Sequence, residues 1–167
     1  MHAASENQYY IDVWFNGRVD PVSFRVGQED VGRFQGDYQN DRDSFFVCAT
    51  VDKTVIAINL KQVEMAHLRR VTGAAEDNDV AAGAWLAIHT LNRQPYLCST
   101  ADLQALAQVF LLFESAVTVP REVIPLNDHA GQLVMFDPAA VLYIEALGSA
   151  VAEGKRLLYA KERQSSQ

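Results

Sequence analysis

The sequence has few cysteines, no long apolar segment and no excess of basic residues, and each lack excludes a class of protein. Two cysteines in 167 residues cannot form the disulfide framework of a small secreted domain. The longest apolar runs, such as residues 109–113, are far shorter than the roughly 18–20 residues of a transmembrane helix. Acidic residues outnumber basic ones by 21 to 14, which disfavours a broad surface for nucleic acid. We therefore expect a cytoplasmic protein with no membrane partner.

The familiar motifs of catalytic and metal sites are missing as well. The sequence contains no Gly-x-Ser-x-Gly, no phosphate-binding glycine-rich loop, no Cys-x-x-Cys and no His-Glu-x-x-His. Residues 1–8 lack the basic start and the apolar stretch of a secretory signal, and we expect them to be disordered. The sequence therefore predicts no catalytic residue, no metal ligand and no cofactor.

The composition is that of a folded domain. Hydrophobic residues make up 49% of the chain and charged residues 21%, and the length fits one ordinary domain. The acidic stretch 72–83 is the best linker in the sequence. It separates a first β-rich unit, 9–71, from a second, 84–148, and leaves 149–167 as a C-terminal helix or strand with a polar tail.

The first unit is expected to begin with a hairpin, because apolar residues alternate on both sides of Asn16-Gly17, a pair that favours a tight turn. A short helix over 28–38 and two central strands, 45–51 and 54–59, follow from the spacing of their apolar residues. Segment 59–71 fits either a strand or a helix.

The second unit follows a similar plan. We expect a hairpin around Asn92-Arg93, then a helix over 101–113 capped by Ser99 and Thr100. A proline-interrupted edge strand follows within 117–126. The final apolar stretches are 132–136 and 141–147, of which the second fits a strand or a helix.

A short motif occurs once in each unit: an apolar strand, Asn59 or Asp137, three residues, and then Val63 or Val141. This element resembles the bent strand pair of small SH3-like and Sm-like barrels. The repeated order of elements predicts a β-rich α+β fold with two related ββαβββ units packed as one pseudo-twofold domain. The resemblance implies that each unit is a small barrel of this kind. No Sm-type RNA-binding signature accompanies it, so the RNA activity of that family is not transferred.

Several polar residues are weak candidates for a ligand site. Glu64 and His67 have a spacing that places two metal ligands on one face of a helix, but on opposite faces of a strand. His89 lies in an otherwise apolar strand, where a neutral imidazole with one hydrogen-bond partner is the commoner finding. The remaining candidates are the turn residues Asp128 and His129 and the basic pair Arg69 and Arg70, near Lys53 and Lys61.

The aromatic residues of the first hairpin are candidates for an interface. Tyr9, Tyr10, Trp14 and Phe15 lie on strands that no earlier strand precedes, so a free sheet edge and an aromatic patch coincide. We expect self-association through this hairpin, most simply as a dimer.

Taken together, these patterns favour a non-enzymatic binding or assembly module that self-associates, with a further protein partner also compatible. An RNA or small-ligand binding protein of the Sm-like or SH3-like kind is the alternative. An enzyme with an unrecognised site is the third interpretation. Cys48 and Cys98 are expected to be small buried hydrophobic residues rather than reactive thiols.

Overall fold

A computed structural model of the chain describes residues 7–71, 85–99, 102–127 and 132–166. These residues form a mixed α+β fold with three α-helices and antiparallel sheets, as the composition and patterning predict. The predicted linker 72–83 and most of the predicted disordered start lie outside the described residues. Gln8 corrects the boundary of that start, because it is already paired with Gly27 in the first hairpin.

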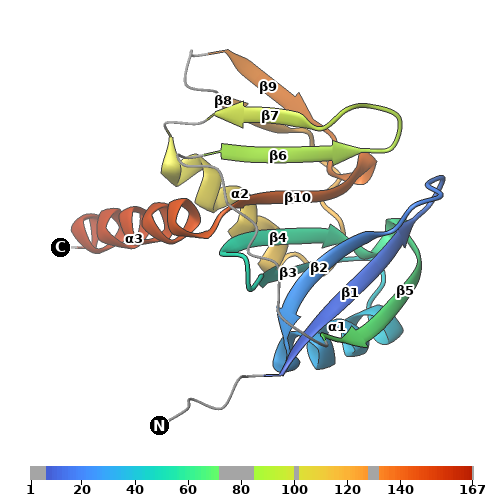
Figure 1. Cartoon of the computed structure of the whole chain (residues 1–167). Helices are drawn as coiled ribbons and strands as arrows, with labels where there is room; N and C mark the ends of the chain where they lie inside the picture. Colours follow the sequence, from blue (N-terminus) through green and yellow to red (C-terminus); the bar gives the residue numbers. More distant parts are fainter. Residues whose placement is uncertain (1–6, 72–84, 100–101, 128–131, 167) are drawn as a thin grey trace, which may run out of the picture.

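The described part of the chain is arranged around a five-stranded sheet of order β3-β4-β10-β6-β7 (Figure 1). A three-stranded sheet, β2-β1-β5, and helix α1 cover one side of strands β3 and β4. Helices α2 and α3 and the two-stranded sheet β8-β9 cover the other side. Each side encloses its own apolar cluster, and β3, β4 and β10 contribute side chains to both.

The first unit comprises hairpin β1–β2, helix α1, hairpin β3–β4, a 3-10 turn and strand β5. Its elements are β1 (Gln8–Phe15), β2 (Val22–Gly27), α1 (Gln28–Asn40), β3 (Phe45–Ala49), β4 (Thr54–Asn59), η1 (Leu60–Gln62) and β5 (Val63–Arg70). Gly17 has a φ of 78°, a conformation that glycine adopts without steric cost, which explains the predicted Asn-Gly turn. Strand β1 lies between β2 and β5, so the edge that the first hairpin contributes is β2 and not the strand that carries Tyr9, Tyr10, Trp14 and Phe15.

The second unit has the same order of strands and helices, followed by one more helix. Its elements are β6 (Trp85–Thr90), β7 (Tyr96–Ser99), α2 (Leu103–Ser115), β8 (Ile124–Asn127), β9 (Leu133–Phe136), η2 (Pro138–Ala140), β10 (Val141–Leu147) and α3 (Gly148–Ser165). Strand β6 lies between β7 and β10, as β1 lies between β2 and β5. The units differ in their outer pairing, because β4 pairs with β10 whereas β9 pairs only with β8 among the described strands.

Asn59 and Asp137 each begin a 3-10 turn that joins two strands. The side-chain oxygen of Asn59 accepts from the backbone N–H of Lys61, and that of Asp137 accepts from Ala139. A strand follows each turn, which settles both segments that the sequence left open between strand and helix. Asn59 is buried, and its Nδ2 donates to the carbonyl oxygen of Val141 at 2.9 Å, so one side chain connects the two units.

Three details of the predicted elements need correction. Among the described strands β3 pairs only with β4, so it is an edge strand rather than a central one. Its side chains are apolar on both faces because a layer of the molecule covers each face. Helix α2 is capped by Asp102, whose carboxylate accepts from the N–H of Ala105 at 3.0 Å. Ser99, one of the two predicted caps, is the last residue of β7, and Thr100 lies outside the described residues. Residues 117–119 form no strand, and the proline-containing strand begins only at Ile124.

Candidate functional site

A polar cluster occupies the outward face of β1 and its two neighbouring strands. Asp12 lies at its centre, with Ser23 Oγ donating to Oδ1 at 2.6 Å and Arg69 Nε donating to Oδ2 at 2.6 Å. His67 Nδ1 is 3.4 Å from the same carboxylate. In a nucleophilic triad the serine would bond to the histidine, whereas here the hydroxyl bonds directly to the carboxylate. The cluster therefore stabilises the sheet surface and does not activate a nucleophile.

The carboxylate of Asp12 is held in its charged form by these neighbours. Burial acts to raise its pKa, but hydrogen bonds from Arg69 and Ser23 and the charge of Arg69 outweigh burial, and the pKa is lowered. A carboxylate with a lowered pKa in the folded state adds stability above its unfolded pKa. That stability is lost as the pH falls through the folded pKa.

Asp12→Asn is expected to lower the free energy of unfolding by about 1–2 kcal/mol at neutral pH, because the amide keeps the shape but loses the charge that Arg69 binds. The difference from the wild type should shrink as the pH falls below the usual range of a carboxyl group. Urea unfolding at several pH values measures it, with the exposed Asp20→Asn as the control. A pH-independent difference would contradict the assigned role of the charge.

The other weak candidates are dispersed. Glu64 and His67 are exposed on strand β5, where the pairing with β1 has a bulge at Glu64. No group of three or more potential metal ligands occurs among the described residues. His89 is buried, its Nε2 is 3.1 Å from Glu145 Oε1, and its ring stacks on Tyr143 with centroids 3.9 Å apart. Asp128 and His129 lie outside the described residues.

The basic residues do not gather into one surface. Arg69 and Arg70 are neighbours on β5 and point to opposite faces, and the guanidinium of Arg69 lies over the ring of Tyr10. Arg70 donates to the side chain of Asn7. Lys53 is in the β3–β4 turn and Lys61 follows the far end of β4. These four residues therefore offer no continuous path for a phosphate backbone.

The aromatic residues of the first hairpin divide between core and surface. Phe15 is fully buried and stacks on Tyr143, so it is unavailable for an interface. Tyr9, Tyr10 and Trp14 are half-buried, and self-association through them stays a prediction. Both cysteines are buried, and burial raises the pKa of the Cys48 thiol to about 12, as expected for an unreactive side chain.

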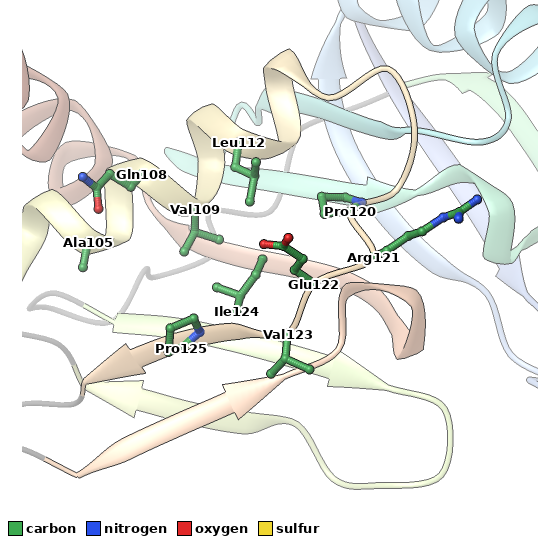
Figure 2. A pocket seen from close by; sticks show the side chains of 10 residues that line it. All are labelled: Ala105, Gln108, Val109, Leu112, Pro120, Arg121, Glu122, Val123, Ile124 and Pro125. Atoms are coloured by element: carbon green, nitrogen blue, oxygen red, sulfur yellow. The ribbon is translucent and has the colours of Figure 1, made fainter.

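A groove of about 620 Å³ lies between α2 and the segment that leads into β8 (Figure 2). One wall is a stripe of α2 that includes Val109 and Leu112, and the other is formed by residues 120–125. The volume falls within the range of about 300–1,000 Å³ that is usual for ligand pockets. Most of the lining is apolar, and its members are Ala105, Val109, Leu112, Pro120, Val123, Ile124 and Pro125.

One acidic group lies within this apolar groove. Figure 2 shows the carboxylate of Glu122 between the two walls, while the side chain of Arg121 extends away from them. The structure gives Glu122 no ion pair within the described ranges. The apolar walls and the carboxylate of Glu122 together favour binding of a ligand that has an apolar group with a positive charge next to it.

A second hollow, of about 460 Å³, adjoins the groove through Pro120 and Arg121. Its lining contains charges of both signs: Lys61 and Arg121 are basic, and Asp43 and Asp137 are acidic. No sign of charge prevails, so it does not select an anion or a cation. The apolar groove is the stronger candidate site.

Sequence reasoning missed this groove, although α2 carries a signal for it. Leu106, Phe110 and Phe113 form a buried apolar stripe on α2, and Leu103 at its start is partly buried. The helix also has apolar residues outside that stripe, and Leu112 is 40% exposed. A helix that is apolar on several faces is expected to contact more than one surface. The position of Glu122 in the groove could not be predicted from the sequence, because it depends on the path that residues 116–123 take past α2.

Comparison with known proteins finds no matching family model, no matching curated protein and no matching solved structure. No helix within the described ranges has both the length and the apolar character needed to cross a membrane.

Proposed function

We propose that this protein is a non-enzymatic binding or assembly module that self-associates, and that the groove beside α2 is its principal contact surface. The observation that carries this proposal is the apolar groove itself, an open hollow whose walls expose Leu112 and Val123 to solvent. Apolar surfaces of this kind on a folded domain commonly mark contacts with another molecule.

The absence of assembled catalytic groups in the described part of the chain supports a binding role. Asp12, Ser23 and His67 form a structural cluster with the wrong connectivity for nucleophilic catalysis. His89 has a carboxylate partner and an aromatic neighbour but lies outside the groove. An RNA-binding role finds no support in the dispersed basic residues.

We further propose that the chain is built from two related units of the SH3-like or Sm-like kind. The shared order of elements supports this interpretation, as do the matched turns that begin at Asn59 and Asp137. A cytoplasmic location agrees with two buried cysteines that lie in different apolar clusters.

Leu112→Glu is expected to raise the dissociation constant for self-association at least about tenfold, because a second carboxylate would then lie in the apolar groove beside Glu122. Light scattering coupled to gel filtration, over a range of protein concentrations, measures the effect. Val19→Glu is the matched control, since Val19 is 90% exposed and lies outside the groove. A wild-type chain that stays monomeric at tens of micromolar would contradict the proposed function.

A further inference from the structure

We propose that the groove receives the distal half of α3, residues 157–165, from a second copy of the chain, and that two copies exchange these halves reciprocally. This inference rests on the proposed self-association and names its contact. It identifies what each copy inserts and where the inserted segment binds.

The two halves of α3 have different surroundings. Every buried residue of this helix belongs to its first seven positions, where Ala150, Val151 and Gly154 pack against the body of the molecule. Figure 1 shows the rest of the helix extending past α2, with its end away from the sheets. Apolar side chains continue into that half as Leu157, Leu158 and Tyr159, and Tyr159 is 50% exposed. Leu157 and Leu158 are partly buried, so Tyr159 is the large apolar side chain that the distal half exposes most.

The end of the chain and the rest of the chain also differ in net charge. Residues 155–167 contain four basic and one acidic residue, whereas residues 1–154 contain ten basic and twenty acidic ones. Lys155 and Arg156 form ion pairs with Glu114 and Glu153 of their own chain, so the basic residues of segment 157–165 are Lys161 and Arg163. A basic helix and an acidic body attract each other, and Glu122 places one acidic charge within the groove. The apolar and basic groups of the distal half thus match the chemistry that the groove favours.

The helix cannot reach the groove of its own chain. It packs on the side of α2 that carries Leu103 and Ala107, which are the nearest neighbours of Gly154. Lys155 also bonds to Glu114 on that side, with 3.1 Å between Nζ and Oε1. At about 100° per residue, positions 105 and 112 lie on the opposite side of α2. A continuous α3 on one side of α2 therefore leaves the groove on the other side for a second chain.

Reciprocal exchange fills the groove and covers the projecting half-helix of both copies at once. Each chain has one projecting half-helix and one groove, so a two-fold arrangement fills both grooves and leaves no helix unpaired. Such closure predicts a dimer with twice the mass of the 18.5 kDa chain, and no open series of larger assemblies.

The first test is the mass of the full-length chain and of a chain that ends after Arg156, which keeps Lys155 and its bond to Glu114. We expect a dimer for the full chain and a dissociation constant at least about 30-fold higher for the shortened chain. A shortened chain that dimerises as tightly as the full one would overturn the inference and leave self-association intact. A monomeric full chain would overturn both.

The second test examines the charge in the groove. Glu122→Lys is expected to raise the dissociation constant at least about tenfold, because it places a cation against the basic half-helix. Asp20→Lys makes the same change in net charge at an exposed position outside the groove and is expected to change it less than about twofold. Equal effects of the two substitutions would show that only overall charge matters and would refute the proposed contact.

The third test locates the contact directly by disulfide cross-linking. One chain carries Ala160→Cys on the distal half of α3 and the other carries Val123→Cys in the groove, while the native Cys48 and Cys98 are buried. Oxidation of the mixture is expected to give a cross-linked pair, and Val19→Cys in place of Val123→Cys should give none. Cross-linking that is no better at Val123 than at Val19 would exclude the proposed contact.

Discussion

Replacing Gly154 with alanine is expected to lower the free energy of unfolding by about 3 kcal/mol, although alanine favours helices more than glycine does. A Cβ atom at this position would lie 2.0 Å from the carbonyl oxygen of Leu103 and 2.9 Å from the Cβ of Ala107. Backbone cannot move aside as a flexible side chain can, so α3 must shift away from α2. Thermal or urea unfolding measures the loss.

Helix α1 provides the matched control for Gly154. Gly36 is also inside a helix, but a Cβ there would meet nothing within 4 Å. Gly36→Ala is therefore expected to stabilise the chain by about 0.5–1 kcal/mol through helix propensity alone. If both substitutions had the same small effect, the close approach of α2 and α3 at Gly154 would be refuted.

Phe110→Ala and Phe34→Ala are each expected to destabilise the chain by about 3–5 kcal/mol, and each should shift one common unfolding transition. Both side chains are almost completely buried, Phe110 in the cluster around α2 and Phe34 in the cluster around α1. Losses of this size are a large share of the 5–15 kcal/mol that stabilises a typical domain.

A single transition is expected because neither cluster belongs to one unit. Phe45 of the first unit stacks on Phe113 of the second, with ring centroids 4.1 Å apart. Phe15 of the first unit stacks on Tyr143 of the second, with centroids 5.5 Å apart. Loss of either unit would therefore expose apolar surface of the other.

Calorimetry tests this cooperativity by comparing the calorimetric enthalpy with the van't Hoff enthalpy for the wild type and for both variants. Leu103→Ala and Val31→Ala serve as milder controls, since these side chains are only partly buried at the edges of the same two clusters. Two separate transitions, one of which responds to each phenylalanine substitution, would contradict the shared core.

The features that could be predicted from the sequence are those that depend on interactions between residues close together in the chain. The turn at Asn16-Gly17 requires a residue that tolerates positive φ, and the turns at Asn59 and Asp137 require a side-chain oxygen that accepts from the backbone. The buried stripe of α2 follows from helical spacing. These features depend on a few neighbouring residues, so the sequence reveals them.

The features that only the tertiary structure shows are those that depend on contacts between segments far apart in the chain. Alternating apolar residues show that a strand has buried faces but not which strand lies beside it. The central position predicted for β3 is therefore wrong, and the pairing of β1 with β5 was not predicted. Phe15 was placed at an interface for the same reason, because Tyr143 comes to it from the distant strand β10. The groove exists only where residues 120–125 pass beside α2, and Glu122 enters it through that packing. Contacts between segments far apart in the sequence depend on the whole chain, and local pattern does not encode them.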